Sequence, residues 1–563
     1  MKRIRKNSKF AAGLVGAALV LAACGGGSDS SDDTTDNGGN GGTGGAMTIT
    51  YDINEEAVWE DGSPITAADF ECTWQAALNT PGSIVTSGYD KITAVAAGDS
   101  DKQVVVSFKE LYAPYKGLFG GLIKKAAVAD CNDISADFQQ EMKFSGTPWK
   151  MDSWSADQVV YVPNENYWGE NKAGYDQLVM VPRPETEITD LKAGGVDFIY
   201  PQFYAGIEDE LADPNVKTVL NYGGDYEALY MNLGVDGKDA DGNARPFADA
   251  AFREGFYKSI DLDALFKQIY IPIAADGELL TCGPIVPGRY CPEGIFGNKY
   301  DLDEAAKVME DGGYAKDSDG MWAKDGAVPT VKWVINTGNT RRESTQAYLI
   351  PLLKEAGFNV EPYNCDAECY FQKRLPGMDY DLAMYISTAP PDPAYLVSSF
   401  AGDKVPTEAN NMAGQNFQGW VNDAATEALN ASDKEVDEGK REDLIKSAIE
   451  EMDKDYIMIP LFQFPKSGAY RTDLVGNVEG QLNNYAAFND TWQWEDKNGD
   501  GKVVIGAEQW PGCLNPITEC ANSSWYVWTV ANVLMPGVWL TTNDGNYELT
   551  ELVSGEPKVE IND

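Results

Sequence analysis

Histidine is absent from this chain of 563 residues. A serine–histidine–aspartate triad, a histidine-paired thiol and a histidine-ligated zinc or iron site all need an imidazole, so the sequence excludes them. Basic residues are also scarce: 44 Lys and Arg stand against 88 Asp and Glu, a formal net charge of −44. This charge repels nucleic acid and anionic lipid headgroups, and neither is expected as a partner. We interpret the negative charge as acidic residues spread over the surface of a secreted protein, where they favour solubility, and not as a site that stores cations.

Long apolar runs are missing as well, apart from one near the start. Residues 11–23 are apolar and follow ten residues that include five lysines and arginines. A run of this length is too short to span a bilayer and is typical of a secretory signal peptide, which we place at residues 1–23. No other stretch of 18 apolar residues occurs.

The predicted signal peptide runs into the sequence LAACG at residues 21–25. Small residues before a cysteine, with glycine after it, resemble the lipobox of bacterial lipoproteins, which implies cleavage before Cys24 and a lipid thioether on its sulfur. An ordinary signal peptide with an incidental Cys24 is the alternative. Residues 24–46 consist mainly of Gly, Ser, Asp, Thr and Asn and are expected to form a flexible tether. These features predict an extracytoplasmic protein whose only membrane contact is an N-terminal lipid.

Cysteine usage fits an exported protein. Nine cysteines occur, and eight remain when Cys24 is set aside. An even number in an exported chain favours disulfides, although eight cysteines allow about 105 pairings. Pairing nearest neighbours predicts Cys72–Cys131, Cys282–Cys291, Cys365–Cys369 and Cys513–Cys520. A zinc site on Cys365 and Cys369 is the alternative, but no second closely spaced pair completes it.

The remaining sequence alternates short β-rich runs with amphipathic helical stretches, which indicates α/β architecture. At 43% hydrophobic residues, the chain has enough apolar material for more than one core and for two to four domains. The clearest predicted strands are residues 104–108, 158–162, 177–181, 331–336 and 381–386. The clearest predicted helices are residues 302–309, 344–356 and about 435–455.

Several short motifs occur in a fixed order along this body. Residues 59–69, WEDGSPITAAD, resemble the W-x-D-G-x-P-x-T-A-x-D signature of the extracytoplasmic solute-binding proteins of peptide-type ABC importers. Further similar motifs lie at residues 145–149, 164–169, 193–197, 246–254, 416–420 and 459–461. One motif alone would be weak, but the ordered set resembles this family, bacterial solute-binding protein family 5, over residues 47–490.

The resemblance implies a two-lobed, periplasmic-binding-protein-like α/β fold of type II, cluster C, with a hinge and an interlobe cleft. It implies lobe I at residues 47–229, lobe II at 230–470 and a return to lobe I at 471–563. The implied function is capture of an oligopeptide or similar solute and its delivery to an ABC permease and ATPase. Such a protein is expected to be a monomer and to need no cofactor, no metal and no catalytic residue.

The order of segments departs from the family in one place. Residues 501–563 resemble the part that family members place first, whereas here they come last. We therefore predict a circular permutation, which is tolerated when the original termini lie close together at the surface. It predicts that residues 559–561 lie beside Met47.

The predicted junction, residues 496–501, reads D-x-N-x-D-G and matches the opening of a calcium loop. The twelfth loop position, where a bidentate acid is expected, is Ala507, and Glu508 follows one residue late. A plain Asn/Asp/Gly turn explains the sequence better than calcium coordination.

Candidate ligand contacts are loop residues at strand ends beside the matched motifs, because ligands of this fold are expected in the cleft. Aromatic rings supply contact area there, and amides satisfy polar ligand groups. For each aromatic residue, core packing is the alternative. The candidates are Gln509, Trp510, Asn515, Phe203, Tyr204, Asn336, Gly338, Asn339, Tyr385, Ser387, Thr388, Asn416 and Trp420.

A second departure concerns specificity. Peptide binders of this family carry an aspartate before a D-P pair, where it binds the ammonium group of the peptide. Here Ala389 and Pro390 cannot supply that charge. Asp392 is retained, but the sequence does not show where it points, so recognition of a free peptide amine is an open question.

Two other functional classes stay open at this point. One is an extracellular sensor or adhesin that uses the same fold without transport. The other is a glycosidase with two carboxylates about 5 Å or about 6.5–9.5 Å apart, although no motif selects such a pair.

Overall fold

The computed structural model describes residues 46–562, except residues 185, 202–203, 275, 293, 367–368, 408–409, 411–413, 477, 479–487, 489, 519–525 and 543–545. The predicted signal peptide, Cys24 and nearly all of the tether lie outside the described residues, as do Phe203 and Cys520. Within the described part, no helix has the length and apolar character needed to cross a membrane.

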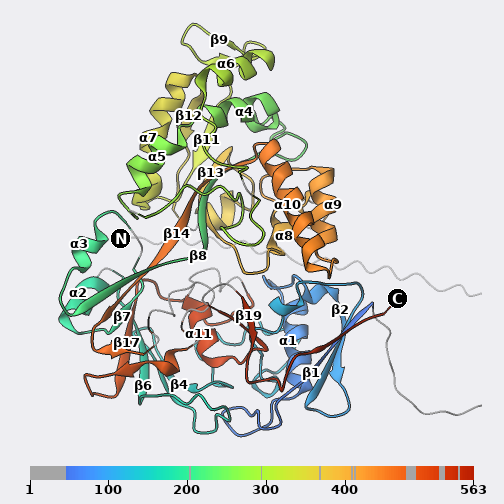
Figure 1. The fold of residues 1–563 in the computed structure, drawn as a ribbon, viewed down its shortest axis with the longest axis vertical. Helices are drawn as coiled ribbons and strands as arrows, with labels where there is room; N and C mark the ends of the chain where they lie inside the picture. Colours follow the sequence, from blue (N-terminus) through green and yellow to red (C-terminus); the bar gives the residue numbers. More distant parts are fainter. Residues whose placement is uncertain are drawn as a thin grey trace, which may run out of the picture. The chain divides into compact units, whose positions relative to one another are not determined.

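Ten strands form the main mixed sheet, in the order β12-β11-β13-β8-β14-β7-β17-β6-β5-β4 (Figure 1). Their bounds are β4 Trp149–Trp154, β5 Val159–Pro163, β6 Gln177–Pro182, β7 Phe198–Ile199, β8 Val216–Met231, β11 Thr330–Val334, β12 Asn359–Pro362, β13 Leu382–Thr388, β14 Met458–Arg471 and β17 Lys502–Ala507. The strands predicted at 158–162, 177–181, 331–336 and 381–386 are confirmed within two residues. Strand β17 runs parallel to both β6 and β7, so the C-terminal part of the chain completes this sheet.

A smaller sheet joins the two ends of the described chain. It has the order β2-β3-β1-β20, with β1 Met47–Asp52, β2 Ile92–Ala97, β3 Gln103–Phe108 and β20 Lys558–Ile561. Strand β20 pairs antiparallel with β1, and Ile561 lies opposite Met47. The predicted adjacency of residues 559–561 and Met47 is therefore confirmed, while the circular permutation itself stays a prediction.

The remaining strands are two-residue or three-residue pairs. Their bounds are β9 Ala315–Lys316, β10 Trp322–Ala323, β15 Leu474–Val475, β16 Glu495–Asp496, β18 Trp539–Thr541 and β19 Tyr547–Leu549. The helices are α1 Ala67–Asn79, α2 Glu187–Ala193, α3 Ile207–Leu211, α4 Ala250–Lys258, α5 Leu262–Leu265, α6 Leu302–Asp311, α7 Thr340–Ala356, α8 Tyr395–Phe400, α9 Asp423–Ser432, α10 Glu438–Lys454 and α11 Tyr526–Leu534.

The three predicted helices correspond to α6, α7 and α10. Helix α7 begins four residues before the predicted start because the Asn339 side chain accepts the backbone N–H of Arg342 and caps the first turn. It ends at Gly357, whose φ of +104° is a left-handed conformation that glycine adopts without strain. Helix α10 begins at Glu438, where Asp437 is the capping residue.

The described residues form two extensive hydrophobic cores and two smaller clusters, of which the larger includes Ile285, Leu396 and Ile449 and draws on residues 226–458. The first core includes Ile49, Trp149 and Trp494 and draws on residues 47–200 and 470–553. The second core includes Trp333 and Leu461 and draws on residues 160–469. The long antiparallel strands β8 and β14 run side by side between these parts (Figure 1). Their register shifts twice, at residues 460–462 and 463–465, so the ladder that links the two cores is irregular at its middle.

Three predicted disulfides are confirmed: Cys72–Cys131, Cys282–Cys291 and Cys365–Cys369. The zinc alternative at Cys365 and Cys369 is wrong, because a disulfide consumes both thiolates. Cys513 is disulfide-bonded. Its predicted partner, Cys520, lies outside the described residues.

Candidate ligand-binding site

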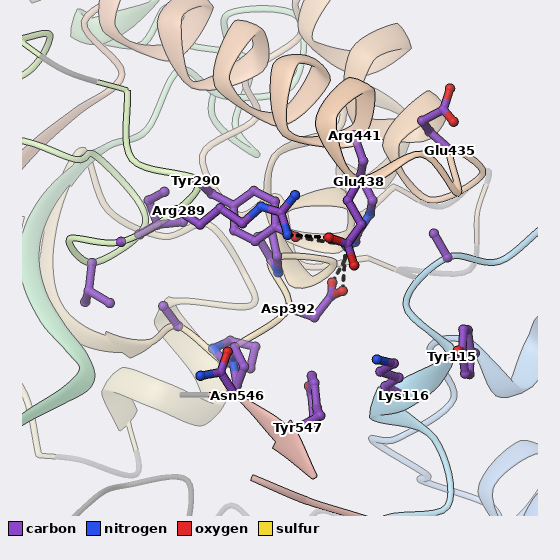
Figure 2. Close-up of a pocket in the computed structure, with 18 of the residues that line it drawn as sticks. Tyr115, Lys116, Arg289, Tyr290, Asp392, Glu435, Glu438, Arg441, Asn546 and Tyr547 are labelled. Carbon is purple, nitrogen blue, oxygen red and sulfur yellow. Dashed lines mark hydrogen bonds and ion pairs between the residues drawn. The ribbon is translucent and has the colours of Figure 1, made fainter. Parts of the chain in front are cut away.

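A cavity of about 700 Å³ lies beside the irregular part of the β8–β14 ladder, and we call it the cleft cavity (Figure 2). Tyr222 and Gly223 of β8 and Gln463 of β14 belong to its lining. The Gln463 amide donates to the Gly223 carbonyl at 2.8 Å, which holds the two strands together at this point. The other lining segments are residues 285–290, 389–393, 435–441, 113–116 and 546–547, with Met47, Val559 and Ile561. Ligand that enters this cavity would contact elements that pack on different cores.

Asp392, whose direction the sequence left open, points to Arg441 of helix α10 (Figure 2). The two terminal nitrogens of Arg441 donate to the two carboxylate oxygens, each at 2.7 Å. Both side chains are largely buried, at 7% and 16% exposure. A bidentate pair of this kind satisfies the carboxylate and leaves it no free charge for a ligand ammonium.

Arg289, the second arginine of the cleft cavity, is also paired. Its guanidinium donates to Glu438 at 2.8 Å and to Glu442 at 3.0 Å. Its neighbour Tyr290 contributes an aromatic face to the cavity wall. Both arginines of this wall are therefore occupied by carboxylates before any ligand binds.

A second cavity of about 450 Å³ adjoins the first, and we call it the aromatic cavity. Five aromatic side chains line it: Tyr167, Trp168, Trp492, Trp539 and Tyr547. Two carboxylates, Asp490 and Glu551, line it as well, and that of Glu551 accepts hydrogen bonds from the Tyr167 hydroxyl at 3.2 Å and from the Asn171 amide at 3.1 Å. Lys116 and Tyr547 line both cavities.

The residues predicted to contact ligand lie elsewhere, and none of those that the structure describes lines either cavity. Asn416, Trp420 and Asn515 are almost fully buried. The Asn416 amide donates to carbonyls of its own loop, the Trp420 indole donates to Asp455 at 2.8 Å, and the Asn515 amide donates to Ile134 at 2.7 Å. In this conformation these three side chains hold loops in place and present no polar group to a ligand.

The predicted residues after β11 belong to the start of helix α7. Asn339 caps that helix, and the Gly338 N–H donates to Glu343 at 2.8 Å. Asn336 accepts a hydrogen bond from Arg342. On β13, Tyr385 stacks on Tyr230, Ser387 hydrogen-bonds the Tyr230 hydroxyl, and Thr388 donates to Asp225.

The remaining predicted contacts sit at the end of β17 and after β7. Gln509 is exposed, and Trp510 stacks on Trp154 with ring centroids 5.2 Å apart. The Tyr204 hydroxyl donates to Glu210. Sequence reasoning missed the segments that do line the cleft cavity, apart from the P-P-D-P run that contains Asp392.

The junction at residues 496–501 is a series of turns. Asp496, Asn498 and Asp500 each accept, at 2.9 Å, the backbone N–H two residues later. Side chains that cap the backbone in this way explain the Asn/Asp/Gly pattern without a cation. Among the described residues no group of three His, Cys, Asp or Glu side chains could hold a metal ion. The turn interpretation is confirmed, and calcium coordination gains no support.

The motif residues build the fold and not the cavities. Asp69 accepts the backbone N–H groups of Thr66 and Lys125, each at 2.9 Å, and the Trp59 indole N–H at 3.3 Å. Thr66 and Asp69 thus form a capping box at the start of helix α1. Asp197 accepts the backbone N–H of Val504 at 2.7 Å and so attaches strand β17 to the sheet.

Solved structures show the class of protein to which this architecture belongs. The chain is similar to the periplasmic EDTA-binding protein EppA, with a TM-score of 0.68 and 20% identity over 79% of this chain and 84% of that one. It is also similar to the oligopeptide-binding protein AppA from Bacillus subtilis in complex with a nonapeptide, with a TM-score of 0.64 and 18% identity over 80% and 88%. The protein has the two-lobed α/β fold of periplasmic binding proteins.

Sequence comparison then gives the family. The family described as bacterial extracellular solute-binding proteins, family 5 middle, matches residues 43–407. Since this match covers more than half of the chain, the protein belongs to that family. The oligopeptide-binding protein OppA of Bacillus subtilis (strain 168) is 25% identical over 440 residues, which are 71% of this chain and 74% of that protein. The family consists of extracytoplasmic solute-binding proteins of ABC transporters and not of enzymes, so the glycosidase alternative is set aside.

Proposed function

We propose that this protein captures an oligopeptide or a similar solute in the cleft cavity and delivers it to the permease and ATPase of an ABC importer. The observation that carries the proposal is a cavity of about 700 Å³ at the β8–β14 ladder, lined by segments that pack on different cores. Its volume lies within the range of small-molecule and cofactor sites. The relatives OppA and AppA are oligopeptide-binding proteins, which supports a peptide as the solute.

The binding movement follows from the same arrangement. Lobe I, residues 47–229 and 471–563, and lobe II, residues 230–470, would close on the solute by bending at β8 and β14. The register shifts of these strands at residues 460–465 supply a place where the ladder bends at low cost. Hydrolysis or group transfer plays no part, and the cargo is released unchanged.

The location is part of the proposal. Cys24 would carry the lipid, and residues 25–46 would hold the monomeric binding unit close to the membrane. A lipid anchor keeps such a protein at the permease, where captured solute is needed.

Mass spectrometry of the small molecules that co-purify with the protein tests the proposal directly. We expect peptides, and we expect synthetic copies of them to raise the melting temperature as RT ln(1 + [L]/Kd) requires. Absence of co-purifying peptides, together with no thermal shift from a peptide pool at millimolar concentration, would contradict a peptide-binding role. Peptide uptake that persists unchanged in a deletion strain would favour the sensor or adhesin alternative.

A further inference from the structure

Lys116 differs from the other charged residues that line the cleft cavity. Arg441 pairs with Asp392, and Arg289 pairs with Glu438 and Glu442. Lys116 makes no ion pair with any carboxylate of the described residues. It is half-buried, and its position in the cavity wall is visible in Figure 2. An unpaired cation in a partly desolvated cavity attracts an anionic group of a ligand.

The one other unpaired charge of this cavity is Glu435, and it faces away. Its carboxylate accepts the backbone N–H of Asp437 at 2.8 Å and points outward in Figure 2. Asp392, the retained aspartate of the D-P pair, is paired with Arg441. Among the residues that line the cleft cavity, Lys116 is therefore the one cation that no ion pair occupies and that is left to pair with an anionic group of a ligand.

The position of Lys116 is fixed by its neighbours. It lies in the single turn Tyr115–Gly117, which follows Pro114. Its ammonium group sits 5.0 Å from the centre of the Trp539 ring. A cation over an aromatic face is attracted by roughly 0.5–1 kcal/mol, which favours this placement. Trp539 belongs to the wall of the aromatic cavity, so the ammonium group stands where the two cavities meet.

The aromatic cavity has walls suited to a planar apolar group. Its lining includes the aromatic rings of Tyr167, Trp168, Trp492, Trp539 and Tyr547. Aromatic pairs gain free energy from offset or edge-to-face contact beyond the area that they bury. Two carboxylates, Asp490 and Glu551, also line this cavity, and Glu551 is held by hydrogen bonds from Tyr167 and Asn171. Lys116 is the one lysine or arginine among the lining residues, so an anionic group would pair at its end of the cavity.

We propose that the two cavities form one site for a ligand that carries a carboxylate next to an aromatic ring, the carboxylate pairing with Lys116 and the ring entering the aromatic cavity. This inference rests on the proposed function. A peptide with a C-terminal aromatic residue fits it, and so does a free aromatic acid. The remainder of a peptide would lie in the cleft cavity with its N-terminal amine unpaired.

Titration calorimetry on the full mature chain with defined probes separates these possibilities. The probes are Ala-Ala-Ala-Phe with free ends, its C-terminal amide, its N-acetyl form, Ala-Ala-Ala-Ala, and 3-phenylpropionate. We expect the amide and the tetra-alanine peptide each to bind at least tenfold more weakly than Ala-Ala-Ala-Phe. The N-acetyl form should bind within threefold of it. Binding of 3-phenylpropionate as tight as that of the peptide would assign the site to free aromatic acids.

Substitution of Lys116 tests its role, and substitution of Lys125 is the matched control. Lys116→Met should bind acid and amide equally, at the weak level that the amide shows with the natural protein. Lys125→Met, which removes an exposed lysine outside both cavities, should keep the tenfold preference. Equal melting temperatures of the two variants would show that both fold.

Three results would overturn the inference: equal binding of acid and amide, loss of binding on N-acetylation, or tetra-alanine binding equal to that of the aromatic peptide. Failure of all five probes to bind would overturn it as well. The proposed function fails separately, if no peptide co-purifies and the wider peptide pool gives no thermal shift. Peptides without aromatic C-terminal residues in the co-purified material would contradict the inference and leave the proposed function intact.

Discussion

The backbone N–H of Ala113 donates a hydrogen bond to the backbone carbonyl of Asp433 at 2.7 Å. Ala113 belongs to a segment that packs with the first core, whereas Asp433 lies between helices α9 and α10. Beside this bond, Lys434 pairs with Glu110 at 2.7 Å. These contacts join two of the segments that line the cleft cavity. The Oδ1 atom of Asp433 is buried and has no hydrogen-bond partner in the described structure.

Burial raises the pKa of Asp433 to about 7, against the attraction of Arg441 and Lys91 and with the repulsion of Asp392 and Asp90. When folding raises the pKa of a carboxyl, that group stabilises the folded state at low pH. This contribution is lost as pH rises from the unfolded pKa, about 4, to the folded pKa. Between pH 4.5 and pH 8, we expect the free energy of unfolding of the natural protein to fall by on the order of 2 kcal/mol relative to that of Asp433→Asn. Urea unfolding across that range measures the difference.

The exposed Asp443 of helix α10 provides the control for this experiment. Asp443→Asn should follow the pH dependence of the natural protein. Parallel stability curves for the natural protein and Asp433→Asn would show that Asp433 ionises normally in the folded state.

The bidentate pair of Asp392 and Arg441 makes a second prediction. Removal of one partner leaves the other charge largely buried and unpaired, which costs about 3 kcal/mol. We expect Asp392→Ala and Arg441→Ala each to show such a loss, and the double variant to lose 1–3 kcal/mol less than the sum, roughly the size of contact couplings. Additive losses in a double-mutant cycle would mean that the two residues do not interact in solution.

The fold was predictable to a large extent because its signals are local. Strand and helix patterns placed the five predicted strands and the three predicted helices, and the spacing of Cys282 and Cys291 suggested a loop disulfide that the structure contains. The similarity of residues 501–563 to a family N-terminal segment predicted that residue 561 lies beside residue 47, as β1 and β20 show. Such predictions depend on short stretches of sequence and on the order in which the segments of the family follow one another, and both can be read from the sequence alone.

The candidate site was much less predictable, for a physical reason. Asn416 and Asn515 carry polar groups at loop positions, and nothing local in the sequence shows that these groups are satisfied by carbonyls inside the loops. Conversely, Lys116 and Tyr547 stand 431 positions apart and meet only through tertiary packing. Which side chains face a cavity depends on long-range packing that residue type does not encode.

The buried amide of Asn515 yields a prediction that separates stability from binding. Its side chain donates to the carbonyls of Ile134 and Asp137 and accepts the backbone N–H of Ile517. Asn515→Ala leaves these buried groups unsatisfied, and we expect the free energy of unfolding to fall by about 2–3 kcal/mol. Gln509→Ala, at an exposed position in the same segment, should change it by less than about 0.5 kcal/mol.

Ligand affinity decides between the two roles for Asn515. If the Asn515 side chain only holds the loop, Asn515→Ala and the natural protein should bind a peptide with equal Kd. The measurement is made at a temperature where both proteins are folded. A tenfold weaker Kd would return Asn515 to the group of ligand contacts.

Glu227 on β8 carries the last prediction. Its carboxylate is fully buried and accepts hydrogen bonds from Arg341 at 2.6 Å and Arg342 at 2.7 Å, both at the start of helix α7. Burial alone would raise its pKa, but the two guanidinium groups outweigh that effect and lower the pKa to about 2. Glu227→Gln keeps the shape and leaves two buried cations without their counter-charge, so we expect a loss of about 3–5 kcal/mol at neutral pH.

The pH dependence gives this prediction its sign. A carboxyl whose pKa is lowered on folding contributes stability above its unfolded pKa, about 4.5, and that contribution falls away as pH drops toward 2. The natural protein should therefore approach Glu227→Gln in stability between pH 4.5 and pH 2, whereas Glu361→Gln, at an exposed site on β12, should stay equal to the natural protein throughout. A constant gap between the natural protein and Glu227→Gln across this range would show that the loss comes from altered packing, because only a charge interaction disappears when the carboxylate takes up its proton.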